Sequence, residues 1–309
     1  MTTNNKELIG QSMPLPSESN GPPMEYFFVP KESLFDPRKE QRIKWWRTAP
    51  EKVITYRSGI VKDNDGNFLY RYEGGSRLLI GDETKGEAIQ VMDKCEIPWA
   101  EATVNRAFEE LGSKSGQVDV LERGFGMGLT AKRVIENLVP RGGSYTVIEL
   151  NEGDADHARR VWKPTQERSL RGIGRGRGMR STQLNIAIEI VEGEAYEETR
   201  KLAEAGKKFD LIISDTYPLT EDEQGMNDLQ DLDTLKHCLE PNGIFTFFAY
   251  FPESTEDVAY KQINIITRHF RDYTVSRVSV NPPPDYKYLQ TTTGPVRSLP
   301  VIICKNPIL

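Results

Sequence analysis

Residues 120–131 read Val-Leu-Glu-Arg-Gly-Phe-Gly-Met-Gly-Leu-Thr-Ala, which places three glycines at alternate positions. The apolar stretch Val118–Leu121 before them predicts a strand, and the pattern over Thr130–Leu138 predicts a helix. Glycines between a strand and a helix let the backbone turn sharply and approach a ligand closely. Because a glycine pattern alone is weak evidence, the motif needs support from a second feature.

A carboxylate after the next predicted strand gives that support. The strand expected over Tyr145–Leu150 contains Glu149, which lies 21 residues beyond Gly128. An acid about 20 residues after such a loop, at the tip of the second strand, is where a ribose diol is hydrogen-bonded. The spacing therefore favours a nucleotide-like ligand, and the other interpretation is an ordinary sheet that binds nothing at this edge.

The main part of the chain alternates between strand-like and helix-like segments. Strands are predicted over residues 118–121, 145–150, 186–191, 209–214, 244–248, 275–280 and 299–304. Helices are predicted over residues 88–111, 130–138, 154–162, 196–205, 229–238 and 258–270. Such alternation with short links indicates an α/β fold, a doubly wound and mostly parallel sheet that is covered on both faces.

The first 85 residues have a different character. Residues 1–24 are rich in Ser, Pro and Asn, and we expect a flexible tail. Residues 25–85 form an expected β appendage, a candidate lid over the active site, before a main domain over 86–309. Within the appendage, strands are predicted over 53–56, 68–72 and 77–80, and Asp65-Gly66 between the first two is typical of a hairpin turn.

Composition excludes several classes of protein. The 309-residue chain has 40 Lys and Arg against 46 Asp and Glu, a formal charge of −6, and 37% of its residues are hydrophobic. This apolar content supports a core, and the acidity argues against a nucleic-acid coat. No run of 18 apolar residues and no apolar stretch near the start are present, so we expect neither a membrane span nor a signal peptide. Three dispersed cysteines and three histidines without ligand spacing favour reduced thiols, a cytoplasmic location and no metal site.

An acid stands just before the glycines of the loop. Glu122 would repel the phosphate of a dinucleotide, whereas it suits the ammonium group of S-adenosylmethionine. The spacing Glu-x-Gly-x-Gly-x-Gly resembles motif I of class I methyltransferases. That resemblance implies a Rossmann-like methyltransferase fold with S-adenosyl-L-methionine as the cofactor.

Five segments in order make the resemblance narrower. Together they are similar to guanidinoacetate N-methyltransferase and its relatives that methylate small guanidines. The similarity extends over about residues 78–305, its most specific part is Asp-Thr-Tyr-Pro-Leu, and it leaves the first 75 residues unexplained. The segments are Val91–Trp99, Glu122–Met127, Ile148–Gly153, Asp215–Leu219 and Pro282–Tyr288.

The resemblance implies two catalytic carboxylates, Glu96 and Asp215, which hold the guanidino group of the acceptor. Two carboxylates can grip the planar guanidinium fork and orient its nitrogen, and Asp215 is the expected base with Glu96 as its partner. The predicted strand 209–214 ends just before Asp215, at an edge where α/β sheets place ligands. The alternative interpretations are a helix-surface acid for Glu96 and a turn or capping carboxylate for Asp215.

The remaining candidate residues come from the same segments. In class I methyltransferases the region of Gly193–Ala195 lies beside adenine, although Glu194 can equally be a solvated acid, and Tyr217 either lines the substrate pocket or caps a strand. The candidate cofactor-binding residues are Glu122, Gly124, Phe125, Gly126, Gly128, Glu149, Leu150, Gly193, Glu194, Ala195 and Asp215. The candidate substrate-binding residues are Met92, Glu96, Asp215, Tyr217 and Tyr250.

One segment departs from the resembling family. That family has a polar segment after the fifth strand that holds the carboxylate of the substrate, and this chain has Phe248–Glu253 there. Pro252 has no N–H to donate, and Glu253 would repel a carboxylate. An acceptor that is larger, more apolar or differently charged than guanidinoacetate is therefore favoured. Five aromatic residues, Tyr26, Phe27, Phe28, Trp45 and Trp46, either form a lid over it or pack the appendage.

Two other functions stay open at this stage. An indole-type acceptor in secondary metabolism, methylated on carbon or nitrogen, would suit the aromatic residues and Pro252. A non-catalytic RNA-associated protein would use the Gly-Arg tract at residues 171–180, which is otherwise a surface insertion. For the leading hypothesis we expect a small-molecule substrate and neither a nucleic-acid nor a membrane partner, and the sequence leaves a homodimer open.

Overall fold

Seven strands form the central sheet of the computed structural model, in the order β11-β14-β10-β9-β6-β7-β8. Strand β14 is antiparallel to both of its neighbours, whereas β10, β9, β6, β7 and β8 pair in parallel. This is the doubly wound, Rossmann-like arrangement, and the predicted fold class is confirmed. The strands are β6 (Val118–Arg123), β7 (Gly143–Glu149), β8 (Ile186–Glu192), β9 (Phe209–Ser214), β10 (Leu239–Phe247), β11 (Phe270–Ser279) and β14 (Ser298–Pro307).

The structure describes residues 37–62, 65–85, 88–112, 116–173, 186–218, 227–249, 255–291 and 294–309. The contacts of the chain divide it between Asp36 and Pro37, and residues 37–309 form one compact unit. Several expectations fall outside the described residues: the tail at 1–24, the aromatic residues Tyr26, Phe27 and Phe28, most of the Gly-Arg tract, and Tyr250.

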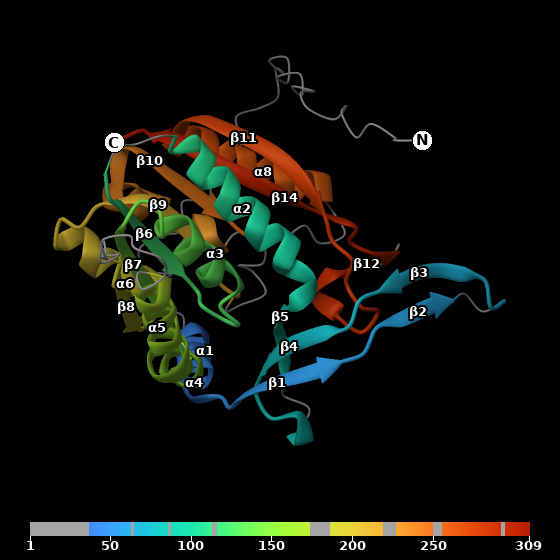
Figure 1. Ribbon diagram of the computed structural model, residues 1–309. Helices are drawn as coiled ribbons and strands as arrows, with labels where there is room; N and C mark the ends of the chain where they lie inside the picture. The colour runs from blue at the N-terminus through green and yellow to red at the C-terminus, as the bar shows by residue number, and fades with distance from the viewer. Residues whose placement is uncertain are drawn as a thin grey trace, which may run out of the picture. The chain divides into compact units, whose positions relative to one another are not determined.

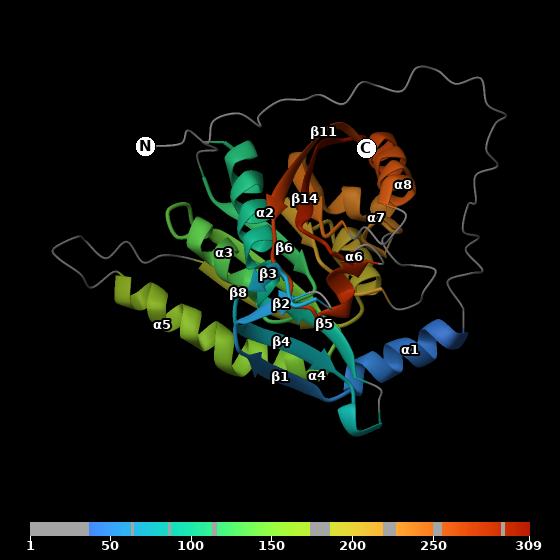
Figure 2. The same ribbon diagram turned by 90° about the vertical axis from the view of Figure 1, so that its right-hand side faces the viewer.

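Helices cover both faces of the sheet (Figures 1 and 2). On one face lie α2 (Ile97–Glu110), α3 (Leu129–Leu138) and α5 (Lys163–Ile173), and on the other α6 (Ala195–Glu204), α7 (Leu232–Leu235) and α8 (Thr255–His269). Neighbouring residues of one strand point to opposite faces of the sheet. Val120 packs in the hydrophobic core under the first group of helices, and Leu121 packs in the core under the second. This double burial explains the unbroken apolar run Leu211–Ile213. No helix in the described ranges combines the length and apolarity that crossing a membrane requires.

A smaller three-stranded sheet with the order β1-β4-β5 precedes the main sheet. The helix α1 (Pro37–Thr48) leads into β1 (Glu51–Tyr56), which pairs with β4 (Gly75–Ile80), and β5 (Ile89–Asp93) completes the sheet from beyond the expected boundary at residue 86.

The hairpin prediction needs a correction. The strand at 53–56 does not pair with the strand at 68–72, because Asp65-Gly66 joins β3 (Phe68–Tyr72) to the nearer β2 (Gly59–Lys62). The short Gly-Ile-Val-Lys segment of β2 gave too little periodic pattern to be recognised as a strand. The turn residues identified the hairpin and not its first strand.

The prediction of a helix over 88–111 was wrong for the residues before Ile97. Residues 89–93 are β5, and Asp93 then caps a short turn, Lys94–Glu96, before α2 begins at Ile97 with Pro98 in its first turn. The Asp93 side chain accepts the Cys95 N–H, and Glu96 accepts the Asp93 N–H in return, which is a capping box. This cap fixes where the helix starts.

Later helices differ from the predictions mainly in length. The helix predicted over 154–162 is α4 (Glu152–His157) followed by a π-helical turn at Ala158–Trp162, and α5 continues it to Ile173. Two short strands, β12 (Gln290–Thr291) and β13 (Gly294–Pro295), also lie before β14.

We expect Gly124→Ala to destabilise the fold more than Gly206→Ala. Both glycines have positive φ, +88° and +68°, so alanine is strained at either position by about 1–2 kcal/mol. At Gly124 a Cβ atom would also lie 2.2 Å from the Asp215 carbonyl oxygen, whereas nothing lies within 4 Å at Gly206. Gly124→Ala should therefore cost about 2 kcal/mol more in the free energy of unfolding, measured by urea denaturation. Equal losses would contradict the close approach.

Candidate functional site

A cavity opens where the parallel strands β6 to β9 end. The chain winds from β6 toward β7 and β8 on one side and returns to β9 and β10 on the other, so these ends meet at the switch point of the sheet. Elements before the main sheet contribute the opposite wall, through Trp46 of α1, Ile80 of β4 and Met92 of β5. The strand ends contribute Gly124 and Gly126, Glu149 to Asn151, Gly193 to Ala195, and Asp215 to Tyr217.

The glycine loop brings the backbone to this cavity. Gly124, Gly126 and Gly128 all have positive φ, and Gly124 lies against the Asp215 carbonyl. Gly124 and Gly126 line the cavity, whereas Gly128 faces a separate groove beside α3. Phe125 is buried in the core against Trp162 and does not line the cavity. Of the predicted loop residues, the structure therefore brings two glycines to the site.

Glu149 lies at the end of β7 with its carboxylate fixed by the backbone. One of its oxygens accepts the N–H groups of Phe125 at 2.8 Å and Gly126 at 3.4 Å, and the other accepts that of Asn151 at 2.8 Å. Burial raises the pKa of Glu149, and these backbone donors act against the rise. A carboxylate offers about four lone-pair sites, so it retains capacity for a ligand hydroxyl at the cavity.

Glu122 occupies a different position from the one that the sequence suggests. It does not line the cavity, and its buried carboxylate accepts the hydroxyl of Tyr145 from the neighbouring strand β7. Burial raises the pKa of Glu122 well above its usual value. This position gives no support to a direct contact between Glu122 and the ammonium group of a cofactor.

Glu96 and Asp215 face the same cavity from different parts of the chain. Asp215 follows β9, and Glu96 ends the short turn before α2. Burial, with the neighbouring Asp228, raises the pKa of Asp215 to about 7. Burial raises the pKa of Glu96 well above its usual value, and the charge of Asp215 adds to this rise. The two carboxyl groups therefore share one electrostatic environment.

Glu96 is 4% exposed and held in place through one of its oxygens. Its Oε1 accepts the Tyr286 hydroxyl and the Asp93 N–H, and no described residue donates to Oε2. The Arg77 guanidinium lies 4.9 Å from the centre of the Tyr286 ring and binds Asp93 through Nε at 2.8 Å. Residues 190 positions apart thus fix this carboxylate, and it is not the helix-surface acid of the alternative interpretation.

The Asp215 carboxylate is not held by hydrogen bonds in the way that the Glu96 carboxylate is. Its N–H donates to the Arg123 carbonyl, and no described residue donates a hydrogen bond to its carboxylate. Beneath it, the buried Asp228 accepts the hydroxyls of Ser214 and Thr216, both at 2.6 Å. The Asn227 amide donates to the Thr216 carbonyl at 2.6 Å. The backbone around Asp215 is therefore fixed, while its side chain is free to meet a ligand.

The third strand end contributes Gly193, Glu194 and Ala195 to the lining. Glu194 is the N-cap of α6, and its carboxylate accepts the Glu197 N–H at 2.9 Å. Glu194 therefore caps a helix as well as lining the cavity. The sequence had suggested either a residue beside adenine or a solvated acid, and neither interpretation included this cap. Leu150, after β7, also lines the cavity.

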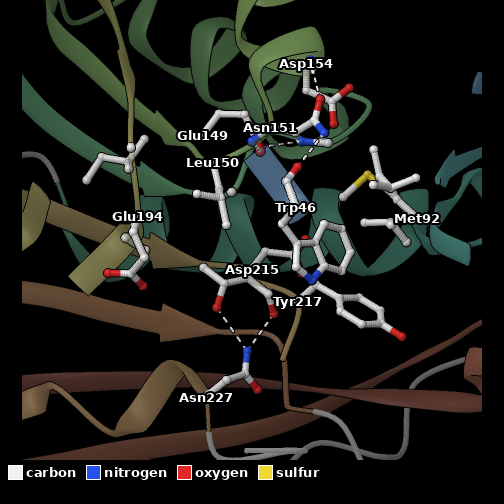
Figure 3. Close-up of a pocket in the computed structure, with 18 of the residues that line it drawn as sticks. Trp46, Met92, Glu149, Leu150, Asn151, Asp154, Glu194, Asp215, Tyr217 and Asn227 are labelled. Atoms are coloured by element: carbon white, nitrogen blue, oxygen red, sulfur yellow. Dashed lines mark hydrogen bonds between the residues drawn. The ribbon is translucent and has the colours of Figure 1, made fainter. Parts of the chain in front are cut away.

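Aromatic rings form one wall of the cavity. Trp46 lies 5.1 Å from Tyr217 between ring centres, and Tyr217 lies 5.6 Å from Tyr288. Figure 3 shows the Trp46 ring beside Tyr217, and the Asn151 amide reaching the Trp46 backbone. Met92 lines the same region and its sulfur accepts the Met127 N–H. Trp46 thus both packs the N-terminal elements and lines the cavity, whereas Trp45 only packs beside it.

Several lining residues were missed in the sequence. Asn151 caps α4 and also donates to the Trp46 and Ala49 carbonyls, which ties α1 to the end of β7. Tyr288 lies in a segment that was recognised without a role, and Asn227 and Asp154 lie outside every recognised motif. Asn151 lies inside the recognised segment Ile148–Gly153, two residues after Glu149, and that position offered a signal.

Comparisons with known proteins give no family, and the similar solved structures are only weakly alike. No protein-family model and no curated protein matches this chain. A spermidine synthase from Thermotoga maritima has a TM-score of 0.46 and 16% identity, over 82% of this chain and 72% of its own. A probable spermidine synthase from Corynebacterium glutamicum ATCC 13032 has a TM-score of 0.45 and 16% identity, over 82% and 79%. Human methyltransferase-like protein 13, solved in complex with SAH, has a TM-score of 0.41 and 14% identity, over 68% and 80%. At such identities the likeness concerns the fold and not the reaction.

We expect the free energy of unfolding of the ligand-free protein to fall as the pH rises from about 4 to about 7. The pKa of Asp215 is raised from 3.8 to about 7 in the folded chain, so the unfolded chain releases this proton first. Asp215→Asn removes the charge, and the variant should gain on the order of 2 kcal/mol relative to the wild type between pH 5 and pH 8. Urea denaturation at both pH values measures this gain.

Glu101→Gln is the matched control, because Glu101 is an exposed acid on α2. Its effect should be the same at the two pH values. If Asp215→Asn also had equal effects at pH 5 and pH 8, Asp215 would not titrate near neutrality.

Proposed function

We propose that this protein is an S-adenosylmethionine-dependent methyltransferase that methylates a guanidino nitrogen of a small molecule. The observation that carries the proposal is the pair Glu96 and Asp215, two carboxyl groups that face one cavity at the switch point of the sheet. Opposite them, Glu149 and the glycine loop occupy the edge at which nucleotide-like ligands are bound.

The residues present fit the cofactor. The lining offers carboxylates, backbone groups and aromatic rings, which suit a ligand with a sulfonium, an ammonium and a ribose. Glu149 would bind the ribose, Gly124 and Gly126 would lie against the sugar and methionine parts, and Glu194 and Ala195 would lie beside the base. When bound, S-adenosylmethionine supplies a methyl group on a positively charged sulfur, which is an electrophile.

Glu96 and Asp215 would prepare the acceptor. The Oε2 atom of Glu96 and the carboxylate of Asp215 have no donor among the described residues, and a guanidinium offers its N–H groups to both. A guanidinium has a pKa above about 12, so its nitrogen must lose a proton as the new N–C bond forms. Asp215, with a pKa of about 7, is the group that accepts this proton.

The aromatic wall favours a second candidate acceptor. Trp46, Tyr217 and Tyr288 would stack on an indole, and Asp215 would then accept an indole proton. We place it second because a single neutral ring makes no use of two neighbouring carboxyl groups.

The direct test incubates the full chain with S-adenosylmethionine and, separately, arginine, guanidinoacetate, butylguanidine or tryptophan. We expect mass spectrometry to detect a methylated guanidine. Glu96→Gln and Asp215→Asn should each reduce turnover by at least about 100-fold, because the acceptor loses a charged partner. Calorimetry should show that both variants bind the cofactor within about threefold of the wild type, with Glu101→Gln unchanged in both respects.

Two results would count against this proposal. Methylation of tryptophan alone would favour the indole acceptor. Near-normal turnover by Asp215→Asn would eliminate Asp215 as the base.

Binding of a guanidinium should tighten as the pH rises. Butylguanidine keeps one positive charge from pH 5 to pH 8.5, so a pH dependence belongs to the protein. Because Asp215 must ionise to bind it, the dissociation constant should fall about tenfold between pH 6 and pH 8 and level off above. Titration calorimetry at each pH measures this, and Asp215→Asn should bind weakly with a flatter pH profile. Equal affinities at pH 6 and pH 8 would contradict an Asp215 pKa near 7.

A further inference from the structure

The lining of the cavity is acidic, and it carries no Lys, Arg or His among the residues that the structure describes. Five of its side chains are carboxylic acids: Glu96, Glu149, Asp154, Glu194 and Asp215. A carboxylate in this cavity would meet like charges and would find no cation among the described lining residues.

The two buried guanidinium groups of the region are already paired and do not line the cavity. Arg77 is 1% exposed and binds Asp93 at 2.8 Å and Asp285 at 3.1 Å. Arg123 is fully buried and binds Asp231 at 2.9 Å. Because neither lines the cavity, neither is placed to pair with a ligand there.

Both amide side chains and the threonine hydroxyl of the lining are also in use, whereas the buried Trp46 indole N–H has no partner among the described residues. The Asn151 amide donates to the Trp46 and Ala49 carbonyls, and the Asn227 amide donates to Thr216. The Thr216 hydroxyl donates to Asp228 at 2.6 Å. At the start of α6, the carboxylate of Glu194 already caps the helix. An acceptor carboxylate would thus lose its hydration without gaining these hydrogen bonds.

Two segments that follow strands of the sheet in the sequence are also acidic. Residues 219–226, after β9, are Leu-Thr-Glu-Asp-Glu-Gln-Gly-Met, and residues 250–254, after β10, are Tyr-Phe-Pro-Glu-Ser. Together they contain four acids and no base.

The aromatic wall suits an uncharged chain. The rings of Trp46, Tyr217 and Tyr288 follow one another at 5.1 and 5.6 Å between centres, and Tyr288 continues to Phe248 at 5.9 Å. Such a row of rings packs against methylene groups and attracts a cation at their end.

We infer that the acceptor is a guanidine without a carboxylate, an alkyl- or aralkylguanidine whose carbon chain lies along Trp46, Tyr217 and Tyr288. The inference rests on the proposed function, since Glu96 and Asp215 bind its guanidinium. The charge of the cavity then excludes guanidines that carry a carboxylate, amino acids included.

The test compares ligands on the unaltered protein, so it needs no variant that might fail to fold. Titration calorimetry at pH 8 measures the dissociation constants of three ligands. Butylguanidine and arginine have the same net charge and differ by the amino and carboxylate groups of arginine. Argininamide has an amide in place of the carboxylate of arginine. We expect butylguanidine and argininamide to bind at least tenfold more tightly than arginine. Equal or tighter binding of arginine overturns the inference and leaves the guanidine methyltransferase standing.

Calorimetry with S-adenosylhomocysteine distinguishes a wrong acceptor class from a wrong cofactor assignment. If this compound binds and no guanidine does, the guanidino acceptor is wrong and the inference fails with it. If neither binds, the cofactor assignment fails as well.

A second experiment tests whether the aromatic wall binds the carbon chain of the acceptor. Trp46→Ala should raise the dissociation constant of butylguanidine at least tenfold and change that of methylguanidine, which has no chain, less than twofold. Phe68→Ala, at a ring that is 62% exposed on β3, is the matched control and should change neither. Equal losses for the two guanidines in Trp46→Ala would remove the aromatic wall from chain binding.

Discussion

The closest approach between the ends of β6 and β9 determines the geometry of the site. Gly124 lies so near the Asp215 carbonyl that no side chain fits between them. The Asp215 N–H donates to Arg123, and the Gly124 N–H donates to Ile148, so the ends of β9, β6 and β7 are tied together. This contact sets Asp215 on one side of the glycine loop and Glu149 on the other. A larger residue at position 124 would separate the two halves of the cavity.

Acids with different surroundings acquire different properties in this cavity. Burial raises the pKa of both Glu149 and Asp215. Glu149 accepts three backbone N–H groups, which act against that rise, whereas Asp215 has no such donors and its pKa rises to about 7. An acid that titrates near neutral pH can accept a proton, and one fixed by backbone donors serves better as a hydrogen-bond acceptor. Because burial raises the pKa values of these acids, ionising them at neutral pH costs folding free energy, as is common at functional sites.

The sequence predicted the fold and the sheet side of the site from local patterns. The glycine loop, the strand–helix alternation and the spacing to Glu149 are all properties of neighbouring residues. What it could not provide are contacts between distant strands and loops. Nothing in its spacing reveals that Glu122 points at Tyr145, or that Tyr286 holds Glu96 from 190 residues away. The start of α2 was misplaced for a related reason, because apolar residues at 89–92 fit a strand and a helix equally well until Asp93 is recognised as a cap.

The two sides of the cavity differ in what they are made of. The strand ends present backbone groups of the glycine loop and the carboxyl groups of Glu149 and Asp215 to the cavity, and their positions depend on the register of the sheet. The opposite wall consists of side chains from α1, β5 and the segment before β12, such as Trp46, Met92 and Tyr288. Substitutions on that wall can alter acceptor choice without disturbing the sheet. If the acceptor is a guanidine, as proposed, a described lining with acids and no base would discriminate among guanidines mainly by repelling the wrong charge, and repulsion needs no dedicated binding residue for the right one.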